Sequence, residues 1–280
     1  MKTKNRFIPL IIIISLVILV SVILFLIYTF SGNYIEYGDL DNSSESTALN
    51  DANNSNVIIV NGIVLGGSNN EKWISSDVIY DAYKNKEGIE VNMFSENKTY
   101  GTYNTASLKK YKKDVVYTTV AKGNLPESYL AVSSNVSTYM PGMTKVDATD
   151  EDIKYVKEAL GSYKIINGSV KINECYLVNI NSSDDKIICA VSSKKNIFGA
   201  YSAVVYVTKN KATLVKYTYV RDVNNSSKFP VYSLKYVKDL NEDDIPEIIL
   251  EETTKNTVSY SLLENRQNKF YQVLKSTIEI

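Results

Sequence analysis

The sequence predicts an α+β fold that is mostly β, in which an N-terminal transmembrane helix precedes antiparallel β-rich modules with two short helices. Residues 7–30 form one uncharged apolar run. Tyrosine occurs 22 times and proline only 5 times, and this composition favours strands over helices. From residue 56 onwards, short β-prone runs alternate with polar turns.

The apolar run at residues 7–30 is long enough to cross a bilayer. About 20 apolar residues cover the ~30 Å hydrocarbon core as a helix, which satisfies its own backbone there. Lys2, Lys4 and Arg6 precede the run, and positive flanks stay inside. We therefore expect a single-pass cell-membrane protein with a cytoplasmic tail at residues 1–6 and an extracytoplasmic C-terminal domain. A cleaved signal peptide, the alternative, needs a shorter apolar segment and a small-residue cleavage site.

A flexible stalk and a first β-rich module are expected to follow the apolar run. Residues 31–55 are rich in Asn, Ser and Asp and lack periodic hydrophobic residues, which is typical of a stalk. The first module covers residues 56–146. Its opening segment NVIIVNGIVLGG predicts a hairpin that turns at Asn61 and Gly62. One short helix is expected in the segment ISSDVIYDAYKNK.

A second module, residues 147–280, is expected to combine a short helix with two similar β-rich units. Thr149 and Asp152 form a capping-box variant at the start of the helix, and Gly161 is expected to stop it. The two units repeat with a period of about 60 residues. They contain ECYLVNINSSDDKIICAVSS and SLKYVKDLNEDDIPEIILEE, and each continues as a second hairpin. Two units cannot close a propeller, so we expect a small twisted sheet or sandwich.

Cys175 and Cys189 are the only cysteines, and they flank the first hairpin of the first unit. Antiparallel neighbours have about the right Cα separation for a disulfide, and an extracytoplasmic location permits one. The pair is therefore a disulfide candidate. A register slip of one residue would instead put the thiols on opposite faces of the sheet, as two small buried hydrophobic residues.

The segment DLNEDDIPEIIL carries the most specific chemical pattern in the chain. Alternate positions offer oxygen atoms: Asp239, Asn241, Asp243, the carbonyl of Ile245, and Glu247. Calcium takes six to eight oxygen ligands, and a tight loop delivers them from such alternating positions. The alternative is an acidic turn that closes a hairpin without metal.

On these residues the chain resembles degenerate FG-GAP or VCBS-type repeats of exported bacterial proteins, whose loops run D-x-[DN]-x-D-G-x-x-[DE] between strands. The resemblance covers the loop and its flanks, and the rest of the second module only as a pattern. It implies that four side chains bind calcium, namely Asp239, Asn241, Asp243 and Glu247. Asp244 replaces the family's glycine, and a left-handed conformation there costs roughly 1 kcal/mol. The first unit has Ile187 where the motif needs an acid.

Other residue patterns restrict the function. The chain has no histidine, which removes His-based catalytic arrangements and most zinc sites. Its 31 basic and 31 acidic residues cancel, which predicts no strong attraction to nucleic acid. Tyr100, Tyr103 and Tyr111 are interleaved with lysines. This segment could stack sugars or meet a wall polyanion, or it could be an exposed strand with snorkelling lysines.

We therefore expect no catalytic activity, no catalytic residues and no nucleic-acid partner. The expected function is that of a membrane-anchored extracytoplasmic binding or scaffolding protein of the bacterial cell envelope. A cell-wall polymer or an envelope protein is the expected partner, and calcium is the expected cofactor. The alternatives are an envelope assembly or signalling accessory protein and a carboxylate-dependent hydrolase.

Overall fold

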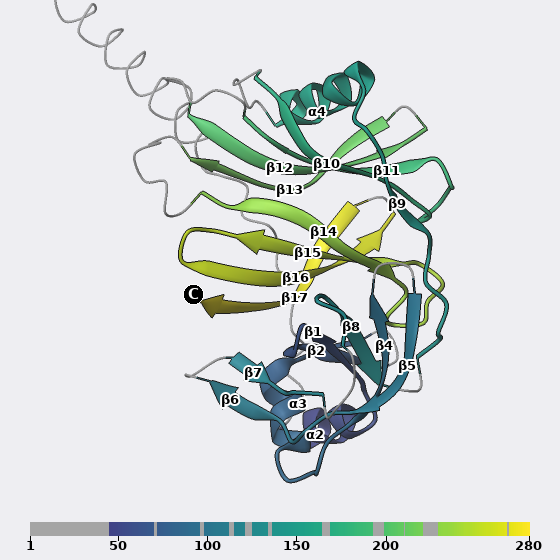
Figure 1. Cartoon of the computed structure of the whole chain (residues 1–280), viewed down its shortest axis with the longest axis vertical. Helices are drawn as coiled ribbons and strands as arrows, with labels where there is room; N and C mark the ends of the chain where they lie inside the picture. Colours follow the sequence, from purple (N-terminus) through teal and green to yellow (C-terminus); the bar gives the residue numbers. More distant parts are fainter. Residues whose placement is uncertain are drawn as a thin grey trace, which may run out of the picture. The chain divides into compact units, whose positions relative to one another are not determined.

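The computed structural model describes residues 45–69, 72–95, 98–111, 115–120, 125–133, 136–163, 169–192, 199–209, 211–220, 229–267 and 269–280. This part of the chain is mostly β and contains three antiparallel sheets and three short helices (Figure 1).

The first sheet is built from the N-terminal strands in the order β5-β4-β8-β1-β2-β7-β6, with β3 paired to β2. Its strands are β1 (Asn56–Val60), β2 (Ile63–Asn69), β3 (Lys72–Ser75), β4 (Glu90–Ser95), β5 (Lys98–Asn104), β6 (Lys109–Tyr111), β7 (Val115–Tyr117) and β8 (Leu130–Ser133). Two helices contact this sheet, namely α2 (Glu45–Asn53) and α3 (Ser76–Tyr83).

The second sheet has the order β13-β12-β11-β10-β9, and the third sheet has the order β14-β15-β16-β17. The second sheet contains β9 (Met143–Lys145), β10 (Lys171–Val178), β11 (Asp185–Val191), β12 (Ala200–Thr208) and β13 (Lys211–Val220), and it is covered by α4 (Asp150–Ser162). The third sheet contains β14 (Val231–Lys238), β15 (Glu247–Thr253), β16 (Thr257–Arg266) and β17 (Lys269–Glu279).

The third sheet shares a hydrophobic cluster with each of the other two sheets. Leu262 on β16 belongs to the same cluster as Phe94 of the first sheet. The next residue, Leu263, belongs to the same cluster as Ile187 of the second sheet. Successive side chains of a strand point to opposite faces, so the third sheet uses one face for each neighbour.

The expected hairpin at Asn61 and Gly62 is confirmed. Val60 pairs with Ile63, which leaves a two-residue turn between β1 and β2. Both turn residues have positive φ, 49° for Asn61 and 84° for Gly62. These angles suit the type I′ turn, whose twist matches that of the two strands.

The start of α4 agrees with the sequence, and its end does not. Thr149 Oγ1 accepts a hydrogen bond from the Asp152 N–H at 3.3 Å, and Asp152 Oδ2 accepts one from the Thr149 N–H at 2.8 Å. The capping box is therefore confirmed. The helix continues through Gly161, because the Tyr163 N–H donates to the Leu160 carbonyl and closes a tight last turn without a left-handed residue.

The expected transmembrane helix is not found among the described residues. In the part of the chain that the structure describes, no helix is long and apolar enough to cross a membrane. The longest described helix, α4, has 13 residues, whereas a bilayer requires about 20. The fold class of the described residues is corrected to mostly β without this helix, and the single-pass cell-membrane location is not supported. Residues 1–6 and 7–30, on which the prediction rested, lie outside the described residues.

The stalk expected at residues 31–55 is wrong for the part that the structure describes. Residues Glu45–Asn53 form α2. Ala52 is fully buried in the same cluster as Ile79 of α3, so burial against the first module holds this polar helix in place. Residues 31–44 lie outside the described residues.

The second and third sheets contain the same four-stranded meander. β10 begins at Lys171, and β14 begins at Val231, 60 residues later. In each meander one β-bulge interrupts the pairing of the first two strands and another interrupts the pairing of the last two. The module boundaries at residues 56–146 and 147–280 stay a prediction.

Candidate functional site

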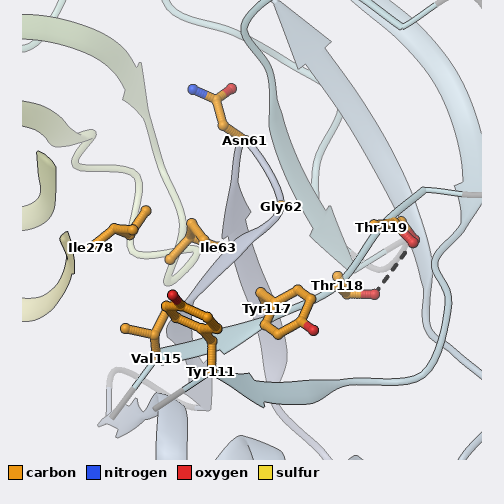
Figure 2. A pocket seen from close by; sticks show the side chains of 9 residues that line it. All are labelled: Asn61, Gly62, Ile63, Tyr111, Val115, Tyr117, Thr118, Thr119 and Ile278. Atoms are coloured by element: carbon orange, nitrogen blue, oxygen red, sulfur yellow. Dashed lines mark hydrogen bonds between the residues drawn. The ribbon is translucent and has the colours of Figure 1, made fainter. Parts of the chain in front are cut away.

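A pocket of about 460 Å³ lies where the β1–β2 turn, the β6–β7 hairpin and β17 meet. Five aromatic or aliphatic side chains line it: Ile63, Tyr111, Val115, Tyr117 and Ile278. In the view of Figure 2, Tyr111 lies beside Val115, Tyr117 lies to their right, and Ile63 and Ile278 lie above them. Asn61, Gly62, Thr118 and Thr119 complete the lining.

One face of the β6–β7 hairpin supplies the aromatic wall of the pocket. Tyr111 pairs with Val115, and Lys109 pairs with Tyr117, so these four side chains share a face. The opposite face turns toward α3. There, Lys110 Nζ lies 2.7 Å from the Asp77 carboxylate. One face of this short hairpin therefore lies at the pocket, and the other face contacts α3.

Two polar side chains that line the pocket, those of Asn61 and Thr118, are already used within the protein. Asn61 Oδ1 accepts a hydrogen bond from the Tyr129 N–H at 2.8 Å, and Asn61 Nδ2 donates to the Tyr260 hydroxyl at 3.0 Å. The Asn61 amide accordingly points away from the tyrosine rings (Figure 2). The Thr118 hydroxyl donates to the Ala106 carbonyl at 2.6 Å. The surface that faces the pocket is therefore mainly apolar.

The predicted calcium loop joins β14 to β15 and is held by its own acidic side chains. Asp239 accepts hydrogen bonds from three successive backbone N–H groups, those of residues 242–244, at 2.7, 3.3 and 3.0 Å. Asp243 accepts one from the Ile245 N–H at 2.8 Å. Asp244 has a φ of 66°, so it takes the left-handed conformation that the motif normally gives to glycine.

Glu247 is fully buried where this loop meets β15. Its Oε2 accepts a hydrogen bond from the Leu240 N–H at 2.8 Å, whereas its Oε1 has no partner. Burial raises the pKa of Glu247 to about 9, and the nearby carboxylates of Asp243 and Asp239 add to the rise. Without a cation nearby, Glu247 therefore carries a proton at neutral pH.

The five predicted ligands lie together in this loop, and they fit calcium in their chemistry. The orphaned oxygen of Glu247 sits at the position that the resemblance assigns to a ligand. The oxygens of Asp239 and Asp243 keep lone pairs beyond their hydrogen bonds. Across the described residues, however, no group of three or more His, Cys, Asp or Glu residues is arranged to hold a metal ion. Calcium would therefore have to draw these carboxylates closer together.

Asp185 is a buried acid that the sequence analysis missed. It is the first residue of β11 and pairs with Val178, as Glu247 is the first residue of β15 and pairs with Lys238. Its Oδ2 accepts hydrogen bonds from the Asn181 N–H at 2.9 Å and from the Tyr206 hydroxyl at 2.6 Å, and its Oδ1 has no partner. When the two units are aligned without a gap, Ile187 rather than Asp185 falls at the position of Glu247. The reason is that the loop between β10 and β11 is shorter than the loop between β14 and β15. An acid directly before an apolar strand was the available signal.

The structure does not bring the candidate disulfide together. Cys175 pairs with Ile188, and Cys189 pairs with Glu174, so the two cysteines miss direct pairing by one residue. Both thiols are free and buried. Cys175 belongs to the cluster under α4, and Cys189 belongs to the cluster shared with the third sheet. They therefore lie on opposite faces of the second sheet.

The tyrosines that alternate with lysines lie on two different strands. Tyr100 and Tyr103 lie on β5, at one end of the strand order of the first sheet. Tyr111 lies on β6, at the other end of that order. Only Tyr111 lines the pocket, where its side chain is exposed.

A buried lysine connects the second and third sheets, and the sequence analysis did not identify it. Lys216 on β13 donates hydrogen bonds to Ser261 at 3.0 Å and Gln272 at 2.8 Å, and its ammonium lies 3.3 Å from Glu252. Burial lowers the pKa of Lys216 to about 8, and Glu252 opposes this shift. Nothing in a strand pattern distinguishes such a lysine from an exposed one.

Comparison of the chain with protein-family models, curated proteins and solved structures found no match. The resemblance to FG-GAP or VCBS-type repeats therefore stays a prediction.

Proposed function

We propose that this protein is a non-catalytic binding protein and that its ligand occupies the pocket beside the β6–β7 hairpin. The observation that carries the proposal is a concave, mainly apolar site of about 460 Å³ with two tyrosine rings in its wall. This volume falls within the roughly 300–1,000 Å³ of small-molecule sites. Tyrosine suits such a site because it offers a large, rigid contact area.

The lining of the pocket favours binding over catalysis. None of the nine lining residues carries a carboxyl, thiol, imidazole or amine group. General acid–base and nucleophilic catalysis most often use such groups within hydrogen-bond reach of the substrate. The proposal accordingly assigns recognition to the aromatic and aliphatic side chains.

Fluorescence titration with N-phenyl-1-naphthylamine, an uncharged apolar probe, tests the proposal. The full-length protein should bind the probe, and Tyr117→Ala should weaken binding by about tenfold through lost apolar contact. Tyr100→Ala is the matched control, since it removes an exposed tyrosine from β5 and should leave binding unchanged. Equal binding by all three proteins would show that the probe does not use this pocket.

The second candidate function is calcium binding by the loop between β14 and β15. The orphaned, buried oxygen of Glu247 favours it. Asp239, Asn241, Asp243, Ile245 and Glu247 would hold the ion, and the ion would stabilise the fold without entering a reaction.

A calcium titration of the full-length protein tests this candidate. Millimolar calcium should raise the melting temperature, and Glu247→Gln should abolish the rise. Asp184→Asn, in the corresponding loop of the first meander, should keep it. An unchanged melting temperature with calcium would exclude the ion from the loop.

A further inference from the structure

We infer that the pocket takes a small amphipathic organic anion, whose apolar body lies against the tyrosine rings and whose acidic group lies at Lys109. This inference rests on the proposed function, because it names the ligand class of the same pocket.

Lys109 is placed at the pocket by the register of the hairpin. It lies directly opposite Tyr117 and two residues before Tyr111. Directly opposite residues have Cβ atoms about 4.5–5.5 Å apart on the same face of a sheet. The ammonium group of Lys109 is therefore within reach of a ligand that contacts both rings, although Lys109 itself does not line the pocket.

The charge of Lys109 is available to a ligand. Within the described part of the chain, Lys109 is exposed and makes no hydrogen bond or ion pair. Its neighbour Lys110 has the same side chain but is engaged, 2.7 Å from Asp77 and 4.8 Å from the centre of the Tyr80 ring. Among the described residues of the hairpin, an anion at the pocket would therefore meet Lys109 as an unengaged cation.

No acid of the lining opposes a negatively charged ligand. The nine lining residues include neither Asp nor Glu. Glu279 follows the lining residue Ile278 on β17, and successive side chains of a strand point to opposite faces. Among the described residues of the lining, therefore, none places a negative charge against the ligand.

The same inventory disfavours a sugar as the ligand. A sugar needs several polar partners, and two of the polar side chains in the lining, the Asn61 amide and the Thr118 hydroxyl, already bond within the protein. The apolar part of a ligand makes no hydrogen bonds, so the internal bonds of these two side chains do not disfavour it. The ligand class is therefore apolar with one acidic group.

A pair of probes with one ring system tests the inference in full-length protein. One probe, 8-anilino-1-naphthalenesulfonate, carries an anionic group, and the other, N-phenyl-1-naphthylamine, lacks it. An exposed ion pair contributes about 0.2–1 kcal/mol, so Lys109→Met should weaken binding of the sulfonate by up to about fivefold. The same variant should leave binding of the uncharged probe unchanged.

Lys110→Met is the matched control, because it removes the same charge from the opposite face of the same strand. It should leave the affinity of both probes unchanged. High salt should weaken sulfonate binding by the native protein and should leave its binding by Lys109→Met unchanged, since screening acts only on the ion pair.

The outcomes separate the inference from the proposed function. If Tyr117→Ala weakens binding of the uncharged probe while Lys109→Met leaves the sulfonate unaffected, the pocket stands and the anionic ligand class is overturned. If Tyr117→Ala changes neither probe, the pocket is not the binding site and both proposals are overturned. Circular dichroism of each variant checks that its fold is intact.

Discussion

Individual buried ionisable side chains make the stability of this protein depend on pH. Glu247 and Asp185 each keep one carboxyl oxygen without a partner. Leaving such a group unsatisfied costs roughly 1–3 kcal/mol. Protonation at Glu247 relieves the cost of a buried negative charge. At Asp185, the Tyr206 hydroxyl and loop amides stabilise the side chain instead.

Glu247 should make the protein less stable as the pH rises. Its pKa is raised from an ordinary 4.5 to about 9, so the folded state binds the proton more tightly than the unfolded state. This contribution is fully present below pH 4.5 and is lost as the pH rises toward 9. Urea denaturation across this range should show the fall, and Glu247→Gln should flatten it. Glu242→Gln, an exposed change in the same loop, should keep the fall.

Lys216 should have the opposite effect at higher pH. Its pKa is lowered from 10.5 to about 8, so between these values the folded state binds fewer protons and stability should rise with pH. At pH 7 the buried charge is a cost. Lys216→Met should therefore raise the free energy of unfolding by about 1 kcal/mol in chemical denaturation. Glu252 is not left unpaired by this change, because it also forms an ion pair with Lys275 at 3.2 Å. A large loss of stability would mean that the Lys216 network stabilises the contact between the sheets.

At the scale of elements, local chemistry was predictable and long-range registration was not. The Asn61–Gly62 turn and the Thr149–Asp152 capping box depend on residues near one another, so the sequence sufficed for both. The Cys175–Cys189 pair depended on the register between β10 and β11, which misses direct pairing by one residue and which no local pattern specifies. The acidic loop between β14 and β15 was located by the spacing of its residues, whereas the pocket combines β2, β6, β7 and β17, which only the packing of sheets brings together.

The close approach of β2 to its neighbours should make Gly66 intolerant of a side chain. Gly66 has a φ of 149°, and a Cβ atom there would lie 2.2 Å from the Ile74 carbonyl oxygen and 2.9 Å from a Leu274 methyl group. Gly66→Ala should cost about 2–3 kcal/mol of stability in urea denaturation. Gly101→Ala is the control, because Gly101 also has positive φ but open space around it. A similar loss at both sites would assign the effect to backbone strain alone.

The start of α4 should depend on Asp152. This fully buried residue receives hydrogen bonds from Thr149 and lies 2.7 Å from Lys186. Burial raises its pKa, but the bonds from Lys186 and Thr149 outweigh burial and leave the pKa below the ordinary 3.8. Its contribution is therefore present above pH 3.8 and lost as the pH falls through the lowered pKa. Asp152→Ala should cost about 2 kcal/mol at pH 7 by thermal denaturation, and Asp150→Ala, which keeps the capping box, much less.

At the scale of the whole described chain, the third sheet couples the other two. Leu262 and Leu263 face different neighbouring sheets, and Trp73 on β3 donates a hydrogen bond to Glu264 on β16 at 2.9 Å. A disturbance on either face should therefore reach the first sheet. The sequence did not predict this arrangement, because the residues of β16 do not indicate which elements cover its two faces.

Leu263→Ala tests this coupling. The change removes a buried side chain at the contact with the second sheet and should cost about 2–5 kcal/mol. Trp73, the only tryptophan, reports on the first sheet. Its fluorescence and the far-ultraviolet circular dichroism should shift to lower urea together. A tryptophan transition that stays in place would mean that the first sheet unfolds independently.

The matched bulges of the two meanders have a consequence for the shape of the second and third sheets. A bulge is one extra residue that bends its strand and increases the local twist. Bulges interrupt the first and the last strand pairs of both meanders. We therefore expect both sheets to bend at corresponding places, although different elements cover them: α4 packs on the second sheet, and the first sheet packs on the third.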